Sequence, residues 1–303
     1  MPELPEVETT TNGLRKTIKN LIIKGVWTDL ATKDKRQVGS VANPKFFLFF
    51  KKEVINSKII SIERRAKNIL INLSNKKTIL VHLKMTGHLL YGEYKFLKKE
   101  NKWKPASDGP LADPYNRFVH FIFIFSNGKN LAFSDARKFG KITLLETDKI
   151  HTSKHLKNIG PEPLSSEFTY KKLKEVVNKK PNWKIKTILM NQEIIAGIGN
   201  IYSDEILWRV GINPERIGSK ISDTEFKEMF KVIKEILNKG IDFGGDSMSD
   251  YRNVYGEKGK FQLHHKAYRR TGEKCSKKGC TGVIKRKIIN GRSGHFCSIH
   301  QAL

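Results

Sequence analysis

The chain has 303 residues, enough for two domains or for one domain with a small appendage. Its 57 lysines and arginines exceed its 30 aspartates and glutamates, and the resulting formal charge of +27 predicts a polyanionic partner, the alternative being a lysine bias that only aids solubility. No apolar run approaches the roughly 18 residues of a membrane span, and the acidic N-terminus lacks a signal core, so we expect a cytoplasmic protein without membrane contact, nucleoid-associated in a prokaryote.

The first eight residues, MPELPEVE, place Glu3 directly after Pro2. If Met1 is removed, which the small Pro2 permits, residue 2 becomes a free secondary amine, and a terminal amine has a pKa of about 7.7 to 8.0. Such an amine can attack an electrophilic carbon and hold the product as an iminium, while an adjacent carboxylic acid donates the proton that the leaving group needs. The alternative is a solvated terminus whose acids merely suit a helix dipole.

Apolar residues at helical spacing predict a helix over residues 5–19, and a second helix is expected from Asn43 and Pro44, with three phenylalanines packed in the core. Short β-rich runs follow. They cover residues 68–73, 78–83, 118–125, 130–133 and 141–145. Asn127 and Gly128 predict a type I′ hairpin turn. This pattern indicates an antiparallel sandwich or flattened barrel that packs against the first helix.

Residues 91–116 form a polar insertion that predicts an exposed loop. In the second half, Ser222 and Glu225 predict a capping box for a helix that ends at Gly240. The fold class is therefore α+β, with a helical region followed by a small cysteine-bearing tail. We predict four segments, namely a domain at 1–150, a linker at 151–166, a helical domain at 167–245 and a loop with a hairpin at 246–303.

All three cysteines lie near the C-terminus. Four residues separate Cys275 from Cys280, sixteen more precede Cys297, and His300 follows after another two. Three thiolates and an imidazole suit a closed, structural zinc site, and the alternative is three unrelated reduced thiols. The fourth ligand is left open among His300, His295, His264 and His265.

Between the cysteines, a strand at 283–289, a tight turn at Asn290–Gly291 and a returning strand at 295–297 place Arg292 at the tip of a hairpin. A guanidinium there can bind phosphate, or it is one more solvated arginine. The motif AGIGNIY at residues 196–202 offers a second phosphate site. Its glycines allow close backbone approach, and the following helix presents free amides with the Asn200 side chain, although many interhelical turns contain glycine.

Basic and apolar residues also occur in three loops of the first half. Arg64, Arg65 and Lys67 precede an apolar strand, where they form a basic sheet edge. Met85 follows another strand, and Arg137 and Phe139 flank Lys138. An apolar wedge with an arginine can fill the gap that a base leaves when it rotates out of a duplex. Core or surface filling is the alternative for each of these residues.

Taken together, the motifs resemble the formamidopyrimidine-DNA glycosylase and endonuclease VIII family, and they occur in the family's order. They are MPELPEVET, RRAKNILINL, HLKMTG, DARKFG, IGPEPL, AGIGNIYSDEIL and GRSGHFC. The resemblance implies an N-terminal β-sandwich, a helix-two-turn-helix domain and a zinc-finger hairpin. It also implies a monomeric enzyme of base excision repair that acts on double-stranded DNA, removes an oxidised base and cuts the strand at the resulting abasic site.

By the same resemblance, Pro2 matches the nucleophile, Glu3 the proton donor and Lys67 a lysine that contacts phosphate and assists elimination. Further matches are DNA contacts, namely Asn200, Arg292, Lys186 and Tyr268, and the inserted residues Met85, Arg137 and Phe139. The inserted residues favour the branch that excises oxidised purines such as 8-oxoguanine and formamidopyrimidines. The alternatives are an oxidised-pyrimidine enzyme of the endonuclease VIII type and a catalytically silent DNA-binding relative.

The chain departs from the family pattern in three places. The first zinc knuckle has four intervening residues where the family usually has two, and His300 stands where a fourth cysteine is usual. Residues 246–251 do not closely match the loop that closes over the flipped base in the formamidopyrimidine branch. The insertion at residues 91–116 has no counterpart with an assigned role.

Overall fold

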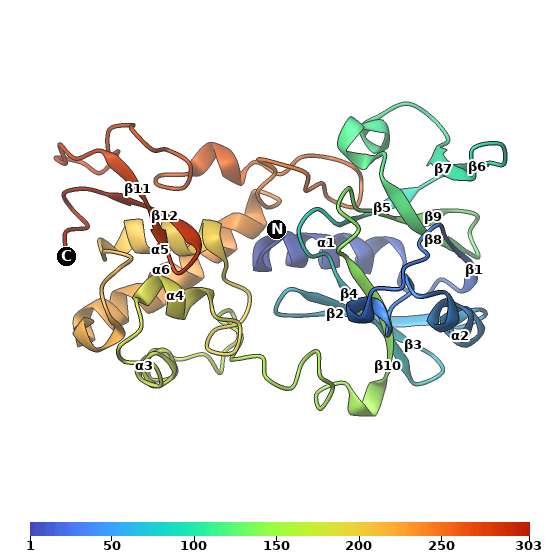
Figure 1. Ribbon diagram of the computed structural model, residues 1–303, viewed down its shortest axis with the longest axis horizontal. Coiled ribbons are helices and arrows are strands. Elements are labelled where there is room, and N and C mark those ends of the chain that lie inside the picture. Colours follow the sequence, from blue (N-terminus) through green and yellow to red (C-terminus); the bar gives the residue numbers. More distant parts are fainter. The chain divides into compact units, whose positions relative to one another are not determined.

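The computed structural model describes residues 1–303, which divide into two compact units. The N-terminal unit comprises Met1–Lys157 and Phe243–Lys260, and the C-terminal unit comprises Asn158–Asp242 and Phe261–Leu303 (Figure 1). The segment 243–260 therefore belongs to the N-terminal unit although it follows most of the helical region. The four-segment division made from the sequence stays a prediction. No helix combines the length and apolar character that crossing a membrane requires.

The N-terminal unit is an antiparallel β-sandwich, as predicted. One four-stranded sheet has the order β1 (Ile23–Thr28), β8 (Val119–Phe125), β9 (Asn130–Ser134) and β5 (His88–Gly92). The other has the order β10 (Lys141–Glu146), β4 (Lys77–His82), β3 (Asn68–Leu73) and β2 (Ile59–Arg65). The five strands predicted for this unit are each confirmed to within a residue at either end.

Two helices, α1 (Leu4–Thr17) and α2 (Pro44–Val54), contribute to the core between the sheets. The start of α2 is as predicted, because the Asn43 side chain accepts a hydrogen bond from the Phe46 amide and Pro44 occupies the first turn. Phe50 is fully buried, but Phe49 is 47% exposed, so its placement in the core was wrong. The buried face of α2 is centred on Phe50 and Val54, and the helical period turns Phe49 away from it.

The turn between β8 and β9 differs from the prediction. Gly128 has a φ of 79°, whereas Asn127 has no positive φ. The Gly128 amide donates to the Phe125 carbonyl, and the Phe125 amide donates to the Lys129 carbonyl. A type I′ turn requires positive φ at both central residues, so this turn is not of that type. It is a three-residue loop that ends in a left-handed glycine.

The insertion at residues 91–116 is not a plain loop, which corrects the prediction. It contains the hairpin β6 (Tyr94–Leu97) and β7 (Lys102–Pro105), and the rings of Phe96 and Trp103 pack against Trp27. The hairpin covers the outer face of the first sheet, where a second apolar cluster lies. Its buried members are Leu90, Tyr94, Val119, Ile122 and Ala132. Strand β8 is apolar on both faces because one face packs in the core and the other packs against the insertion.

The C-terminal unit consists of helices and a hairpin, which confirms the predicted order. Its helices are α3 (Tyr170–Asn178), α4 (Ile185–Met190), α5 (Asn200–Val210) and α6 (Asp223–Asp242). The predicted capping box of α6 is present, with the Ser222 amide 2.8 Å from Glu225 Oε2. The helix continues through Gly240, two residues beyond its predicted end. Packing of α5 against α6, the longest helix, forms the centre of this unit.

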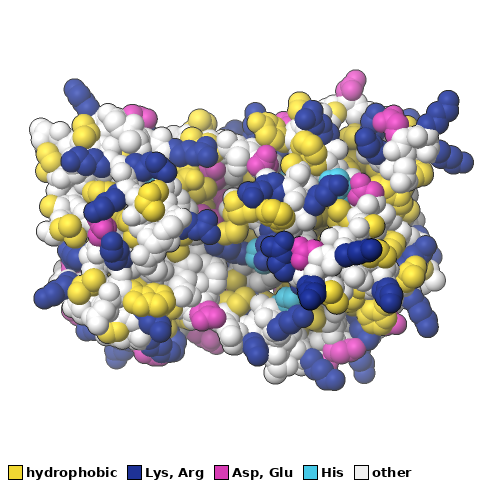
Figure 2. Space-filling view, viewed as in Figure 1, with side chains coloured by type: hydrophobic (Ala, Val, Ile, Leu, Met, Phe, Trp, Pro, Cys, Tyr) yellow, Lys and Arg dark blue, Asp and Glu magenta, His cyan; other side chains and the backbone are white.

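The C-terminal hairpin pairs β11 (Ile284–Ile289) with β12 (Arg292–Cys297). Asn290 and Gly291 have φ angles of 46° and 74°, so the predicted tight turn has the type I′ form. Arg292 pairs with Ile289 directly beside the turn. Lysine and arginine side chains are spread over the face shown in Figure 2, with fewer acidic side chains among them. The charge excess is therefore a surface property of the folded chain.

Candidate functional site

The N-terminal residues are ordered and mostly enclosed. Pro2 is buried and Glu3 is 2% exposed, whereas Met1 is 43% exposed. Glu3 is the N-cap of α1 and forms a reciprocal capping box with Glu6, in which the Glu3 amide donates to Glu6 Oε2 over 2.8 Å. The terminus is thus fixed to a helix start, and the solvated alternative does not describe it.

Glu6 is a candidate site residue that the sequence reasoning missed. Its side chain is buried, and its Oε1 accepts a hydrogen bond from the Asp246 amide over 2.7 Å. The Tyr251 hydroxyl donates to the Glu6 carbonyl over 3.0 Å. Glu6 therefore joins the catalytic candidate Glu3 to the segment 243–260. The spacing of Glu3 and Glu6 is that of a capping box, and this signal was available in the sequence.

Lys67 lies in the two-residue turn between β2 and β3 and is 4% exposed. Helix α1 runs antiparallel to β2, because Arg15 Nε donates to the Ile62 carbonyl while Glu8 accepts from Arg64 Nε, 2.5 Å away. Residues nearer the start of α1 therefore contact residues nearer the end of β2. The turn with Lys67 lies at the same end of α1 as Glu3.

The two loops with the expected wedge residues are tied together through Asp135. Its carboxylate accepts hydrogen bonds from the Thr86 hydroxyl and from the Arg137 amide. The Arg137 guanidinium lies over the Phe139 ring, 4.7 Å from its centroid, and Phe139 is 46% exposed. Met85 is half-buried beside Thr86. The structure thus brings the loops of all three predicted wedge residues together.

Asn200 and Arg292 are brought together in the C-terminal unit. Asn200 is the first residue of α5, and its Nδ2 lies 3.4 Å from the hydroxyl of Ser293, the neighbour of Arg292. Asn200 Oδ1 has no hydrogen-bond partner, and Arg292 is exposed. Gly197, with a φ of 86°, makes the turn that precedes the helix. This arrangement sets the Asn200 amide, at a helix N-terminus, beside the strand residue that follows Arg292.

Lys186 is buried rather than surface-exposed. It is 1% exposed, and its Nζ lies 2.5 Å from Asp204 Oδ1 and 3.0 Å from the Ser203 hydroxyl. The other oxygen of Asp204 accepts hydrogen bonds from the amide and the ring of His295. Asp204 therefore joins α4, α5 and β12, and it positions the hairpin on which Arg292 lies. The sequence reasoning did not single out Asp204.

Tyr268 is held by a second buried acid. Glu205 accepts three hydrogen bonds, from the amides of Lys266, Ala267 and Tyr268, at 2.8 to 3.0 Å. Burial raises the pKa of Glu205, and the three amides act in the opposite direction. The Tyr268 ring lies edge-on to His295 with a centroid distance of 5.1 Å. Glu205 was also missed, although adjacent acids in an otherwise apolar helix of a basic chain are a usable signal.

The three cysteines and His300 form one cluster, with all four ligand atoms within 4.8 Å of one another. Cys275 Sγ lies 3.4 Å from His300 Nδ1, and Cys280 Sγ lies 3.5 Å from Cys297 Sγ. In tetrahedral zinc sites with Zn–S of about 2.3 Å and Zn–N of about 2.0 Å, ligand atoms lie about 3.5 to 3.8 Å apart. The donor set and its spacing fit a tetrahedral metal ion.

Among the histidines left open by the sequence, His300 is the one that lies with the cysteines, whereas His295 is bound to Asp204. The Gly282 amide, and then His300, lower the pKa of Cys280 to about 6, which favours the thiolate form. Gly279, with a φ of 75°, lies in the longer first knuckle and helps it to turn. The four-residue spacing is therefore compatible with a compact cluster.

Comparisons with known proteins agree with this architecture. Residues 1–142 match the model of the formamidopyrimidine-DNA glycosylase N-terminal domain, and residues 159–252 match that of the formamidopyrimidine-DNA glycosylase H2TH domain. The formamidopyrimidine-DNA glycosylase of Pelotomaculum thermopropionicum is 36% identical over 98% of both chains. That of Herpetosiphon aurantiacus is 34% identical over the full length of both chains.

The chain is also similar to solved structures of the Lactococcus lactis enzyme. One structure, bound non-covalently to DNA with an abasic site, has a TM-score of 0.80 at 31% identity and covers 99% of this chain and 100% of its own. Another, of a mutant with Fapy-dG-containing DNA, has a TM-score of 0.82 at 32% identity over both full chains. The chain therefore belongs to the formamidopyrimidine-DNA glycosylase family, whose members are DNA glycosylases of base excision repair.

Proposed function

We propose that this glycosylase excises oxidised purines, including formamidopyrimidines, from double-stranded DNA and then cuts the strand at the abasic site, with Pro2 as its nucleophile. The observation that carries the proposal is the enclosed helix start, where Pro2 and Glu3 are buried and Glu3 is fixed by Glu6. The Fapy-dG and abasic-site DNA held by the Lactococcus lactis enzyme supports this substrate class.

In the first step, the neutral amine of Pro2 attacks the sugar C1′ after Met1 has been removed. The bond from C1′ to the base breaks, and its electron pair leaves with the base, which takes up the proton that the Pro2 nitrogen loses. Glu3 donates a proton to the ring oxygen, the ring opens, and C1′ becomes joined to the Pro2 nitrogen as an iminium. A proton donor at Glu3 requires a carboxyl held at a fixed position, which the capping box provides.

The iminium then acts as an electron sink for strand cleavage. Loss of a C2′ proton breaks the bond from C3′ to its phosphate oxygen, and a second elimination breaks the bond at C5′. The products are two phosphate ends around a one-nucleotide gap and an unsaturated sugar fragment, which water releases from the Pro2 nitrogen. Lys67, at the same end of α1 as Glu3, assists the proton transfers, and Arg292 neutralises a departing phosphate.

DNA contacts come from both units. In the C-terminal unit, Asn200 and Arg292 bind phosphates, Tyr268 contributes a ring and hydroxyl, and Lys186 supports them from below through Asp204. The Asn200 side chain lies at the N-terminus of α5, where its Nδ2 group can donate to a phosphate. In the N-terminal unit, Met85, Arg137 and Phe139 fill the space that a rotated base leaves.

A zinc ion bound by Cys275, Cys280, Cys297 and His300 is part of this proposal. When bound, it supplies structural cross-linking with no open position for chemistry. The His300 Nε2 lies 3.0 Å from the Trp208 carbonyl of α5, and a second hydrogen bond of this kind commonly orients a ligating histidine. The cluster would thus anchor the hairpin with Arg292 to the helical region.

Reduction with borohydride on abasic-site DNA tests the nucleophile. The proposal predicts a covalent protein–DNA adduct with the mature protein and none with a variant in which a leucine inserted before Pro2 keeps the amine blocked. An unblocked Glu8→Gln variant serves as a control for changes near α1, and it should still form the adduct. An equal adduct from the blocked variant would rule out Pro2.

Lesion panels separate the remaining alternatives. We expect faster single-turnover cleavage of duplexes with 8-oxoguanine or Fapy-dG than of duplexes with thymine glycol. Preference for thymine glycol would assign the endonuclease VIII type of specificity instead. Tight, salt-sensitive binding without any incision would indicate a catalytically silent relative.

A further inference from the structure

The segment 243–260 takes part in a series of buried hydrogen bonds that begins at the start of α1. Glu6 receives one hydrogen bond from the Glu3 amide and one from the Asp246 amide, at 2.8 and 2.7 Å. The same segment continues to Tyr251, which is buried and donates to the Glu6 carbonyl. The turn at residues 246–252 is therefore in direct contact with the residue that holds Glu3.

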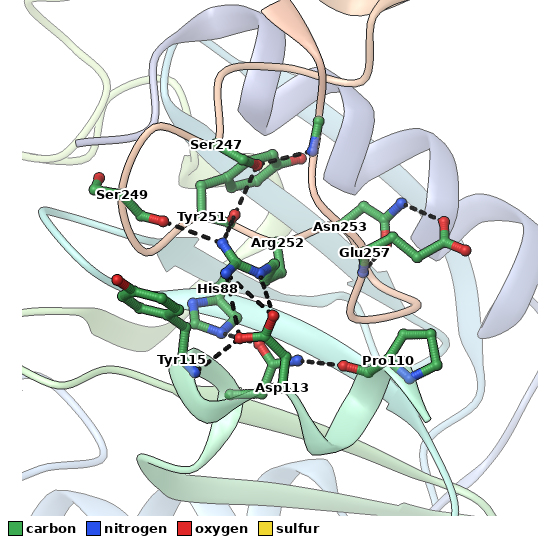
Figure 3. A network of polar contacts seen from close by, with 12 residues as sticks. His88, Pro110, Asp113, Tyr115, Ser247, Ser249, Tyr251, Arg252, Asn253 and Glu257 are labelled. Atoms are coloured by element: carbon green, nitrogen blue, oxygen red, sulfur yellow. Dashed lines mark hydrogen bonds and ion pairs between the residues drawn. The ribbon is translucent and has the colours of Figure 1, made fainter. Parts of the chain in front are cut away.

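The buried side chain of Arg252 binds two carbonyl groups of this turn. It is 1% exposed, and its Nη1 donates to the carbonyls of Ser249 and Tyr251 over 3.1 and 2.9 Å (Figure 3). A buried guanidinium requires a counter-charge, since an unpaired charge in the protein interior is strongly unfavourable. The position of the turn thus depends on where that counter-charge lies.

The counter-charge comes from the insertion at residues 91–116. Asp113 accepts from Arg252 Nε at 3.3 Å and from Nη2 at 3.2 Å, and the Arg252 guanidinium lies 4.7 Å from the centroid of the Tyr115 ring (Figure 3). Asp113 is itself fixed, because its carboxylate caps a short 3₁₀ turn through the Tyr115 amide at 2.9 Å. The pair joins residues 139 positions apart in the chain.

Further contacts hold the insertion and the segment against the sandwich. The Tyr91 amide donates to the Val254 carbonyl over 2.7 Å, and a Cβ at Gly256 would lie 2.5 Å from the Pro110 carbonyl oxygen. Asn116 accepts from the buried His88 over 2.9 Å. The β6/β7 hairpin also packs on the sheet, so several contacts hold the insertion that carries Asp113.

We infer that the insertion is a buttress for the turn at residues 246–252, and that Asp113 and Arg252 are positioning residues for the reaction at the N-terminus. The chain of contacts runs from Asp113 through Arg252 to the turn, and from the turn through Glu6 to Glu3. The pair touches no reacting atom. This inference rests on the proposed function, because it assigns the pair to the alignment of Glu3.

The test compares Asp113→Asn with Asp108→Asn, a matched change at an exposed aspartate of the same insertion. Asparagine at residue 113 keeps the cap of the Tyr115 amide but removes the charge. At a temperature well below the melting temperature of both variants, we expect Asp113→Asn to slow single-turnover excision of 8-oxoguanine by about tenfold or more. Its affinity for abasic-site DNA should stay within about twofold of that of the unmodified protein. Asp108→Asn should leave both unchanged.

Hydrogen exchange and a conservative variant give readouts that general stability does not. Amides of residues 246–252 should exchange faster in Asp113→Asn, while those of the β11/β12 hairpin stay unchanged. Arg252→Lys keeps the charge and should slow excision less than Arg252→Met. If Asp113→Asn does not fold, the double variant with Arg252→Met, which leaves no unpaired buried charge, takes its place with the same expectations.

The outcomes separate this inference from the proposed function. If the unmodified protein forms the borohydride adduct and excises 8-oxoguanine, but Asp113→Asn matches Asp108→Asn in rate and in exchange, the buttress is rejected while the function stands. If the unmodified protein forms no adduct, the proposed function itself fails. Slower excision together with faster local exchange supports the buttress.

Discussion

His300 donates its Nε2 hydrogen to the carbonyl oxygen of Trp208 across 3.0 Å, so helix α5 holds the imidazole of the cysteine cluster. This bond leaves Nδ1, which lies 3.4 Å from Cys275 Sγ, as the ring nitrogen that faces the sulfur atoms. Trp208 also belongs to the apolar cluster around Cys275 and Cys297. The cluster and the helical region are thus parts of one packed structure.

Replacing His300 tests the metal site. His300→Cys creates a set of four thiolates, and we expect it to retain about one zinc per chain. His300→Ala should lose most of the metal and bind DNA at least about tenfold more weakly, because the hairpin loosens. Elemental analysis with a DNA titration provides the measurement. Full zinc content and normal binding in His300→Ala would show that His300 is not a ligand.

Glu3→Gln separates proton donation from helix capping. Glutamine can still accept the hydrogen bond of the capping box, so the melting temperature should change little. It cannot donate a proton as an acid, and we expect single-turnover base excision to fall by about a hundredfold or more. Excision at the normal rate would exclude Glu3 as the proton donor.

Phe139→Ala tests the wedge against a matched exposed phenylalanine. Phe139 and Phe49 are 46% and 47% exposed, so replacing either one by alanine should cost little stability. Only Phe139→Ala should slow excision from duplex DNA, by about tenfold, because the rotated base is then no longer stabilised. Trapping on single-stranded abasic DNA, where no base pair needs to open, should be nearly unaffected. Equal effects of the two variants on duplex excision would contradict the wedge assignment.

His88 predicts a loss of stability in mild acid. Burial, with a smaller contribution from Arg252, lowers the pKa of His88 against the opposing hydrogen bonds to Thr86 and Asn116. Below its ordinary pKa of about 6.5, the unfolded chain binds a proton that the folded chain excludes, so stability falls as the pH drops through that value. Thermal unfolding is measured at about pH 7.5 and about pH 5.5, on either side of this pKa. The melting temperature should fall less on acidification in His88→Gln than in the unmodified protein. Identical drops would argue against His88 as a source.

Local sequence signals predicted much of the fold because their causes are local. Asn43 before Pro44 and Ser222 before Glu225 start helices through bonds within one turn. The same dipeptide, however, gave different turns. Asn290–Gly291 forms the expected tight turn, whereas Asn127–Gly128 lies in a longer loop, because strand register selects the turn type.

The contacts that complete the candidate site were not predictable in this way. Asp113 meets Arg252, and Glu6 meets Asp246, across 139 and 240 residues of sequence. A buried lysine was equally invisible, since Lys186 reads as one more basic residue until Asp204 is placed beside it. The resemblance named candidate chemical residues, but the supporting acids emerged only when distant segments were packed together.

Tandem mass spectrometry of the borohydride-reduced protein–DNA adduct tests the central claim most directly. After nuclease and protease digestion, the account predicts an N-terminal peptide that begins at Pro2 and carries the reduced deoxyribose remnant on its nitrogen. Attachment of the sugar to Lys67 or another lysine, or full activity in protein that still carries Met1, would contradict it.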